Sequence, residues 1–440
     1  MRLAMMSTGR AGLICLLGLV VLGGCQRRTA HPWWRSPDRS TAIRTRPQPA
    51  NAVRAAPRRD LGSLDGEPEL TVRLGSATEL DLVLLRPATL AGRTLSPGPL
   101  AVGIHAHRLQ IAGTPVASEQ AVLRFAGSGP AFACERGAAA RQRTLHGGSL
   151  VLLHDGGTVM VCERLGCEAY LPGVLVREVE PDWPVAALAA QAVAARSYAL
   201  SRWFARRDQP WQLDATPAID MAYGGLPEKI HPNLAAALRS TRGQVLALDD
   251  QVLPAYFHSC SGGMTADVDS VWPGRRFPDG TTDPARALRA VRDPFAEVGA
   301  HGLGREQVMH WECRVELGEV ARLLRGLGEP PLLAPRVQAV HIATRHGDGQ
   351  RVATVELRSD AGAHLVPATV LRRALGSRRV RSTLWDTCLS TRTHLLLRGR
   401  GYGHGVGLSQ ISAWAMAHRG LDARQILAFF YRSARIERCW

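Results

Sequence analysis

The sequence is poor in aromatic residues and lacks the signatures of several common protein classes. Aromatic residues make up 5% of its 440 residues, and no zinc-finger spacing or aromatic RNA-binding motif accompanies its arginines. Neither Ser261 nor Ser409 lies in the Gly-x-Ser-x-Gly spacing of a nucleophile elbow. These absences argue against nucleic-acid binding and against a serine hydrolase. What remains is a globular composition, 45% hydrophobic, with a formal net charge of +16.

Residues 1–25 have the features of a lipoprotein signal peptide. Arg2 and Arg10 accompany an apolar run, Ala11–Gly24, of roughly 14 residues, whereas a bilayer span needs about 20. The run ends in Leu22-Gly23-Gly24-Cys25, which resembles a bacterial lipobox and predicts lipidation of Cys25. We therefore expect an exported lipoprotein of the cell envelope, anchored in a membrane through an N-terminal lipid.

Residues 26–67 are predicted to form a disordered tether rich in arginine and proline. Gln26 to Asp60 contains nine arginines against two aspartates, and such a stretch buries too little apolar surface to offset its ordering entropy. No further linker follows, so 68–440 is predicted to be one folded region. Its β-rich part is 68–165, and its motif-bearing part is 166–440. For an exported basic protein, the obvious polyanion is the cell wall.

The cysteines bear on the redox compartment. Of the nine, Cys15 would leave with the signal peptide and Cys25 would be acylated. Seven remain, so at least one thiol is free or intermolecular, and the connectivity of any disulfides stays open. The seven are Cys134, Cys162, Cys167, Cys260, Cys313, Cys388 and Cys439.

Alternating apolar residues predict strands at the start of the folded region. Leu70, Val72 and Leu74 alternate, and apolar runs at 150–153 and 158–161 flank an Asp-Gly-Gly turn, which is a hairpin signal. Further strands are expected at 80–85, 122–125, 311–315, 337–344 and 352–358, and helices at 320–327, 370–375, 409–418 and from 422. These elements predict a mixed α+β fold.

A buried, alanine-rich helix starting at Pro184 is predicted to form the centre of this fold. No charged side chain occurs from Pro184 to Ala195, so a helix here must be surrounded by protein. We expect it to pack against β-hairpins and a mixed sheet. Gln191 and Arg196 are polar residues on this buried element, so they need partners, and a bound ligand is one candidate.

Glu178 is the candidate acid, because it lies in an otherwise apolar approach to this helix, 174–179. Apolar surroundings favour the neutral form of a carboxyl group, which is the state that a general acid needs. The structural alternative is that Glu178 caps the helix or pairs with Arg177 or Arg196.

A strand pair and a serine-glycine loop follow the helix. Arg242–Leu246 and Pro254–Phe257 are predicted to pair as strands, and the chain then turns through His258–Thr265. Glycines beside small hydroxyl residues make a loop whose amides and hydroxyls can approach a sugar closely. The alternative is a tight turn whose hydroxyls satisfy their own backbone.

The run Gly399–Gln410 has five glycines at alternate positions. This pattern excludes an ordinary helix or packed strand, so the backbone must adopt conformations or contacts that a side chain would block. A phosphate-binding loop fits poorly, because no P-loop lysine follows.

Together these blocks resemble the SpoIID/LytB family of peptidoglycan-acting proteins. The first block is Tyr170-Leu171-x-Gly173-Val174 with Glu178, Trp183-Pro184 and Ala194-Ala195-Arg196-x-Tyr198. The serine-glycine loop is a looser second block, and Gly399–Gln410 matches the family's C-terminal hallmark. The resemblance covers roughly 68–440 and implies a SpoIID-like fold. It also implies cleavage of peptidoglycan glycan strands by a lytic transglycosylase, with Glu178 at the position of the catalytic acid.

The resemblance also implies a set of substrate contacts. They are Gln191, Arg196, Tyr198, Ser259, Ser261, Gly262, His404, Gly405, Ser409 and Gln410. No cofactor is expected. Some members of the family hold zinc, but 208–225, the matching stretch here, contains neither cysteine nor histidine, so no metal is predicted.

Other functions stay open at this point. Glu180 and Asp182 are close enough in sequence to Glu178 to support hydrolysis by water instead. The LytB branch of the family implies a wall-binding protein without chemistry of its own, which enhances a separate cell-wall amidase. A purely structural envelope lipoprotein is a third possibility.

Overall fold

The computed structural model describes residues 64, 66–78, 80–105, 107–136, 144–274, 283–326, 336–347 and 350–440. The predicted signal peptide, Cys25 and nearly all of the predicted tether lie outside these residues. Glu67, assigned to the tether, is part of the folded region, because its Oε1 accepts the N–H of Glu168 (2.8 Å) and its Oε2 pairs with Arg242 (2.7 Å).

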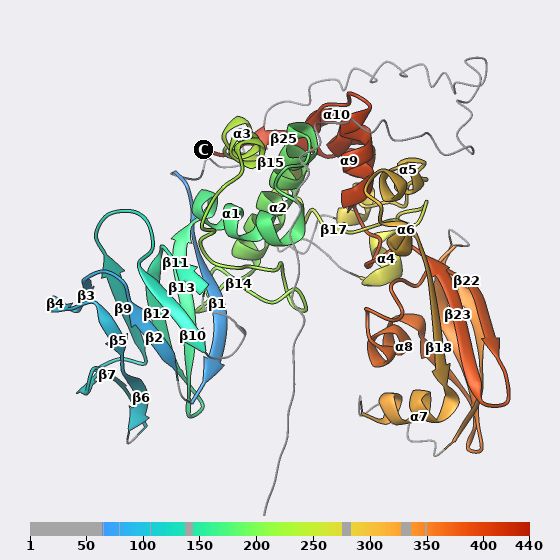
Figure 1. The fold of residues 1–440 in the computed structure, drawn as a ribbon, viewed down its shortest axis with the longest axis horizontal. Helices are drawn as coiled ribbons and strands as arrows, with labels where there is room; N and C mark the ends of the chain where they lie inside the picture. The colour runs from blue at the N-terminus through green and yellow to red at the C-terminus, as the bar shows by residue number, and fades with distance from the viewer. Residues whose placement is uncertain are drawn as a thin grey trace, which may run out of the picture. The chain divides into compact units, whose positions relative to one another are not determined.

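The β-rich start of the folded region contains a seven-stranded sheet in the order β14-β1-β13-β12-β9-β3-β4 (Figure 1). The predicted hairpin is confirmed, since β12 and β13 pair antiparallel around the turn at Asp155–Thr158. The strands are β1 (Glu69–Ala77), β3 (Ala88–Leu90), β4 (Arg93–Leu95), β9 (Gln120–Phe125), β12 (Ser149–Asp155), β13 (Thr158–Gly166) and β14 (Leu213–Asp214).

Two smaller sheets, β11-β10-β2-β5 and β6-β7-β8, complete this part. Leu82, Leu123, Phe132 and Leu150, which come from both of the larger sheets, are buried in one apolar cluster, so the two sheets share a core. The strands are β2 (Asp81–Leu84), β5 (Gly98–Leu100), β6 (Val102–His105), β7 (Arg108–Ile111), β8 (Thr114–Pro115), β10 (Phe132–Arg136) and β11 (Thr144–His146).

The predicted central helix is α2 (Val185–Ala205), which is buried along Ala187–Ser201. The helix begins at Val185, one residue later than predicted, and Pro184 is its N-cap. Helices α1 (Cys167–Glu178), α3 (Pro232–Ser240), α9 (Gln410–His418) and α10 (Ala423–Phe430) all contact α2. The helix also packs against β structure, as expected: the hairpin of β15 (Gln244–Leu248) and β16 (Gln251–Val252) lies against it, and β14 of the seven-stranded sheet contacts it. The many alanines allow this close approach.

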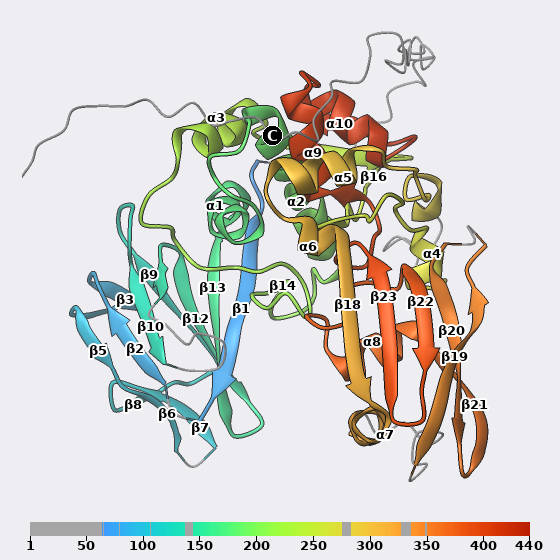
Figure 2. The same cartoon turned by 45° about the vertical axis from the view of Figure 1, so that its right-hand side comes forward.

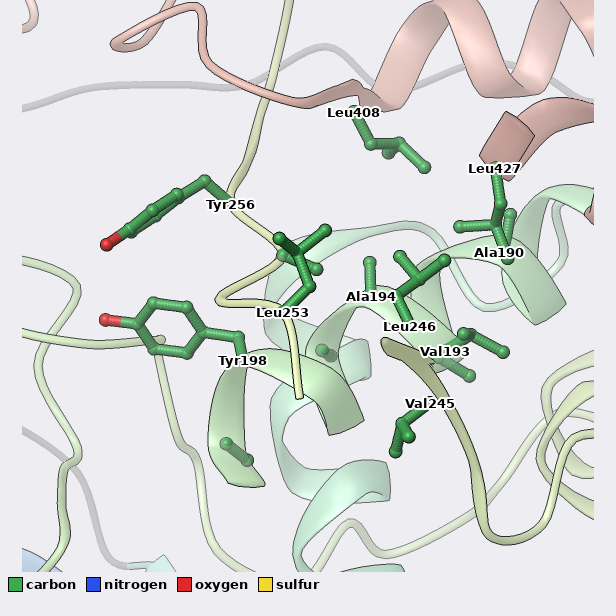
Figure 3. Packing of buried hydrophobic residues seen from close by; sticks show 14 of the residues in the cluster. Ala190, Val193, Ala194, Tyr198, Val245, Leu246, Leu253, Tyr256, Leu408 and Leu427 are labelled. Carbon is green, nitrogen blue, oxygen red and sulfur yellow. The ribbon is translucent and has the colours of Figure 1, made fainter. Parts of the chain in front are cut away.

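Figure 3 shows this packing from close by: Val245 and Leu246 of β15, Leu408 and Leu427 lie around Ala190, Val193 and Ala194 of α2. Near the other end of the cluster, the rings of Tyr198 and Tyr256 lie side by side. Their hydroxyl groups point the same way, away from the aliphatic side chains.

The predicted pairing of 242–246 with 254–257 is wrong. β15 pairs with β16 and with β25 (Arg435–Arg438), near the end of the chain. The second predicted strand is displaced to β17 (Phe257–His258), which pairs in parallel with β24 (Leu408–Ser409). A parallel pair needs a long connection and leaves no local turn signal.

The C-terminal half contains two three-stranded sheets, β18-β23-β22 and β19-β20-β21, which share an apolar core with α7 and α8 (Figure 2). The predicted strands near 311–315, 337–344 and 352–358 and helices near 320–327 and 370–375 are confirmed with shifted ends. The elements are β18 (His310–Glu316), α7 (Leu317–Arg325), β19 (Val337–Arg345), β20 (Val352–Ser359), β21 (Gly362–Pro367), α8 (Ala368–Leu375), β22 (Trp385–Ser390) and β23 (His394–Arg400).

Short helices connect the two halves in sequence: α4 (Val268–Val271), a 3-10 turn at Pro284–Arg286, α5 (Phe295–Gly302) and α6 (Glu306–Met309). The predicted capping box of the last helix is present, because Asp422 accepts the N–H of Gln425 and the Gln425 side chain accepts the N–H of Asp422. The mixed α+β class is therefore confirmed.

Candidate active site

Glu178 is the last residue of α1, a helix that the sequence analysis did not predict. Pro172, Gly173 and several valines lower the helix propensity of this segment, but Tyr170–Leu175 is buried in the central core, and tertiary packing stabilises the helix. Glu178 thus ends α1 and does not stand at the first turn of α2. A helix C-terminus carries partial negative charge, which disfavours a carboxylate at this position.

The carboxyl group of Glu178 is half-buried and has one hydrogen bond of normal length, in which Oε1 accepts the N–H of Ala222 (3.0 Å). Burial raises the pKa of Glu178 above its ordinary value, while the Ala222 N–H and the Gln410 side chain oppose this shift. Among the residues that the structure describes, none forms an ion pair with Glu178. The predicted alternative, pairing with Arg177 or Arg196, is therefore not observed, and Arg196 pairs with Glu168 instead.

The two neighbouring carboxyl groups have different surroundings. Glu180 is exposed, accepts the indole N–H of Trp183 (3.1 Å) and pairs with Arg305. Asp182 is also exposed. Of the three carboxyl groups, Glu178 is the one that is half-buried.

The serine-glycine loop and the glycine run lie side by side. Strands β17 and β24 begin this contact, and isolated bridges join Cys260 to Tyr402 and Ala266 to Val406. Four glycines of the run, Gly401, Gly403, Gly405 and Gly407, have positive φ angles between 73° and 115°. The run therefore needs glycine for its backbone conformation, as expected.

Close contacts explain why glycine is required at two of the predicted site positions, Gly262 and Gly405. A Cβ atom at Gly262 would lie 2.7 Å from the carbonyl carbon of Arg400, and one at Gly405 would lie 2.2 Å from the guanidinium of Arg351. Arg351 is buried and donates to the carbonyl oxygens of Ser261 and Met264. Gly262 and Gly405 thus allow the loop and the run to pack without a gap.

The predicted serines are engaged inside this packing. Asp293 Oδ2 accepts hydrogen bonds from Ser261 Oγ (2.6 Å) and Ser412 Oγ (2.7 Å), and Ser409 Oγ accepts the N–H of Ser261 (3.2 Å). Ser261 and Ser409 are fully buried. Their hydroxyls fix the loop against α9, which matches the structural alternative for this loop. Ser259 is half-exposed beside them.

His404 belongs to an aromatic cluster with Tyr256, His258 and Trp272. The centroid of its ring lies 5.0 Å from Trp272, 5.6 Å from His258 and 6.1 Å from Tyr256. His404 Nδ1 accepts the N–H of Val406 (3.0 Å), so the ring is neutral. Burial and the charges of Arg372 and Arg351 lower the pKa of His404 to about 3. It is therefore no general base or acid near neutral pH.

Tyr198 connects this cluster to α2. Its ring lies 5.7 Å from Tyr256, and its hydroxyl donates to Asp220 (2.9 Å). Gln191 lies seven residues earlier, two turns along the same face of α2. The Gln191 side chain is 2% exposed, and neither of its amide atoms has a hydrogen-bond partner among the described residues. Gln410 Nε2 is likewise buried without a hydrogen bond of normal length.

Arg196 has protein partners for its buried charge. Its guanidinium donates to both carboxylate oxygens of Glu168 (2.9 and 2.8 Å) and to the carbonyl of Gln244 (3.1 Å). Its side chain is 0% exposed. This arrangement joins α1, α2 and β15, and leaves the guanidinium no access to a ligand.

No sequence motif indicated the loop that holds Glu178. In this loop Ala222 donates to Glu178, and Gly224 N donates to the carbonyl of Gly173 (3.0 Å). A Cβ atom at Gly173 would lie 2.3 Å from the carbonyl oxygen of Gly225. The glycine in the Tyr170-Leu171-x-Gly173 motif therefore lets the loop lie on α1. The loop has no periodicity or charge pattern that would have indicated this role.

A buried ion pair fixes the same loop from the β-rich side. Tyr223 donates its hydroxyl to Glu163 (2.7 Å), which also pairs with His146 (2.6 Å) and accepts the N–H groups of Gly147 and Gly148. Burial lowers the pKa of His146, but the Glu163 charge and hydrogen bonds with Cys134 and Glu163 raise it to about 10. The charged pair anchors the residue next to Ala222.

Among the described residues, no helix combines the length and the apolar composition that crossing a membrane requires. Within the same residues, no group of three or more His, Cys, Asp or Glu side chains is placed to hold a metal ion. All seven cysteines that follow the predicted signal peptide are free thiols.

The comparison with known families supports the resemblance that the motifs predicted. Residues 155–248, which contain α1, Glu178, α2 and β15, match the family described as Stage II sporulation protein. This part of the chain is therefore similar to a SpoIID domain.

Three relatives are similar to a large part of the chain. An uncharacterised protein of Brachyspira hyodysenteriae is 28% identical over 66% of this chain and 71% of its own length. The amidase enhancer of Bacillus subtilis is 26% identical over 59% of this chain, and the match spans 39% of the enhancer. Stage II sporulation protein D of Bacillus subtilis is 23% identical over 62% of this chain and 75% of its own length.

Proposed function

We propose that the protein cleaves glycan strands of peptidoglycan by a lytic transglycosylase-type reaction during remodelling of the cell envelope. The observation that carries this proposal is the carboxyl group of Glu178. Burial raises its pKa, and it lies beside Gln410 at the end of the glycine run. A raised pKa favours the protonated form, which is the form that a general acid needs. Glu180 and Asp182 are exposed.

One carboxyl group is sufficient for the proposed chemistry. Glu178 donates its proton to the glycosidic oxygen between N-acetylmuramic acid and N-acetylglucosamine, and the bond from that oxygen to the anomeric carbon breaks. The Glu178 carboxylate then takes the proton of a hydroxyl on the same sugar as its oxygen attacks the anomeric carbon. The product is an anhydro-sugar end, and no water is consumed. The Ala222 N–H stabilises the intermediate carboxylate.

The strand is expected to lie along the glycine run and the aromatic cluster. The half-exposed ring of Trp272 offers an apolar face for a sugar. The amide of Gln191 and the Nε2 of Gln410 have no hydrogen-bond partner among the described residues and are candidate polar contacts. The predicted lipid at Cys25 would hold this site near the wall, at the membrane surface.

The test is mass analysis of the products released from purified glycan strands. Wild type is expected to give anhydromuramic ends, and Glu178→Gln is expected to lose activity by at least about 100-fold. Glu180→Gln is the matched control, since it makes the same chemical change two residues away and should keep most of the activity. Reducing muramic ends would instead show hydrolysis by water.

The second candidate is a wall-binding protein that enhances a separate amidase. The match to a protein named amidase enhancer favours it. In that case Glu178→Gln would leave the effect on wall material unchanged. Adding purified amidase to wild type and variant distinguishes this function from cleavage by the protein itself.

A further inference from the structure

A cavity of about 420 Å³ lies between α6, β18 and the segment that follows α8. Four arginines line it: Arg314, Arg378, Arg379 and Arg381. Its size lies in the range of small-ligand pockets. None of these residues belongs to the site around Glu178, and none was singled out by the sequence motifs.

The positive charge of this cavity is only partly compensated. Arg379 pairs with Glu319 (2.7 Å), and Glu312, the acidic residue among the lining side chains, pairs with Arg398 (2.7 Å). Arg314 and Arg378 are exposed and have no acidic partner among the residues described. Two guanidinium groups are thus available to an anion.

A third guanidinium is already held in place. Arg381 donates to the backbone carbonyls of Gln307 and Arg378 and lies over the ring of Tyr402, 5.7 Å from its centroid. These contacts fix the side chain without neutralising it, so less side-chain entropy is lost when an anion binds.

Trp311 contributes its largely buried side chain to the wall of the cavity. Guanidinium groups bind carboxylates and phosphates through charge-assisted hydrogen bonds, so the arginines are the groups that would hold an anion there.

The cavity adjoins the glycine run. Gly403 N donates to the carbonyl of Arg381 (2.9 Å), and Gly401 N donates to the carbonyl of Met309 (3.0 Å), so both sides of the cavity contact the run. On the side of α6, Arg305 pairs with Glu180, two residues after Glu178. The cavity is therefore adjacent to the glycine run, along which the strand is proposed to lie.

We propose that this arginine cavity binds carboxylate groups carried by the glycan strand, either the lactyl carboxylate of muramic acid or a stem-peptide carboxylate. The inference rests on the proposed function, and it names which part of the substrate is recognised away from the cleaved bond. The cavity makes the protein select muramic-acid strands over uncharged polymers of N-acetylglucosamine.

The test measures binding in the Glu178→Gln background, so that no ligand is cleaved. The probes are purified glycan strands, the same strands with their carboxyl groups converted to neutral methylamides, and each of these with and without stem peptides. The double variant Arg314→Gln/Arg378→Gln is compared with Arg108→Gln/Arg124→Gln, which removes two exposed arginines from the β-rich part.

We expect the cavity variant to bind carboxylate-bearing strands about tenfold more weakly and to bind methylamidated strands as the parent does. The control pair should match the parent on both. Equal weakening by the control pair, or equal binding of charged and neutral strands by the parent, overturns the proposal. So does stronger competition by a glycerol-phosphate polymer than by muramyl strands.

These outcomes separate the inference from the proposed function. If Glu178→Gln binds no glycan, the proposed function fails. If it binds strands without regard to charge, the cavity proposal alone fails. Strands without stem peptides distinguish the two carboxylate sources, since only the lactyl group remains on them.

Discussion

At the level of single residues, the surroundings of each buried carboxyl group decide its charge. Glu163 is fully buried, yet His146 and three hydrogen bonds hold its pKa below the ordinary value despite burial. Glu178 has one N–H donor of normal geometry and no counter-ion among the described residues, and burial raises its pKa. The number of charged and polar partners thus separates a structural carboxylate from a candidate acid.

Glu178 is expected to reduce stability at neutral pH. The pKa of Glu178 is raised in the folded protein above its ordinary value of 4.5. Between pH 4.5 and this raised pKa, the folded state therefore binds more protons than the unfolded state, and the free energy of unfolding falls as pH rises. Glu178→Gln should therefore raise the melting temperature at pH 7 by on the order of 1–2 °C, with a smaller gain at pH 4.5. Thermal unfolding at both values measures this.

Glu180→Gln serves as the control, since Glu180 is exposed and paired with Arg305. An exposed pair contributes about 0–1 kcal/mol, so this variant should show no stabilisation. A lower melting temperature for Glu178→Gln at pH 7 would show that the carboxylate is better satisfied than its contacts indicate.

The His146–Glu163 pair gives stability a second pH dependence. The folded pKa of His146 is about 10, above its ordinary 6.5, so its contribution is complete below pH 6.5 and is lost as pH rises toward 10. We expect the melting temperature to fall across this interval. Glu163→Gln should flatten the fall and lower stability by about 3–5 kcal/mol at pH 7, because it leaves His146 buried without its partner.

Urea unfolding at pH 7 and pH 10 measures both effects. Glu119→Gln, an exposed change in the same part of the fold, should have no effect at either pH. If Glu163→Gln retains the full loss of stability between pH 7 and pH 10, another group titrates there.

At the level of elements, α1 and the loop at 222–225 must fit closely for Glu178 to keep its hydrogen bond. The contact passes through Gly173, where a Cβ would meet both the Gly225 carbonyl oxygen (2.3 Å) and the Tyr223 ring (2.6 Å). The backbone on one side must move if any side chain is added. The loop therefore controls the acid through shape as well as through the Ala222 N–H.

Gly173→Ala is expected to destabilise the protein by about 1–3 kcal/mol through overpacking, and to lower glycan cleavage by moving Ala222. Gly318→Ala in α7 is the matched control, because it is also a helical glycine and has no atom within 4 Å of the added Cβ. That change should be neutral or stabilising by about 0.5–1 kcal/mol. Chemical unfolding distinguishes the two, and equal effects would contradict the packing argument.

Sequence patterns predicted elements wherever the determining interactions are local. The hairpin β12–β13, the capping box at Asp422 and the buried α2 follow from neighbouring residues. The pairing of 242–246 with 254–257 was wrong because β17 pairs with β24, far along the chain. The helix α1 was missed because Pro172 and its valines disfavour it locally, and packing in the central core, against α2 and neighbouring elements, stabilises it.

At the level of the whole molecule, the site could be predicted as a set of motifs but not as an arrangement. Glu178 and the glycine run were identified as separate blocks, and the structure brings Gln410 next to Glu178. Arg196 was predicted to contact substrate because a buried arginine needs a partner, and its partner is Glu168. Ala222, Tyr223 and Glu163 contribute through distant contacts that no spacing in the sequence reveals.

The free thiols lead to a prediction for the whole chain. Burial raises the pKa of Cys162 and Cys260 to about 12, and that of Cys388 and Cys439 to about 11, so their reactive thiolate forms are suppressed. We expect native protein to be alkylated slowly by iodoacetamide at the seven described cysteines, with half-buried Cys388 and Cys439 reacting first, and all of these seven to react in denaturant. Intact-mass analysis counts the modified thiols.

Protein made under oxidising and under reducing conditions should give the same count in denaturant. A deficit of two in the oxidised sample would reveal a disulfide that the geometry of the described cysteines does not contain.

The parallel pairing of β17 with β24 has a consequence for the order in which the proposed site forms during synthesis. Glu178 precedes Gln410 and the glycine run by more than 200 residues, yet the folded protein brings Gln410 next to Glu178. A nascent chain that ends before the glycine run would therefore contain the proposed acid without its neighbours. If the proposed function holds, such a chain would be inactive without a separate inhibitor.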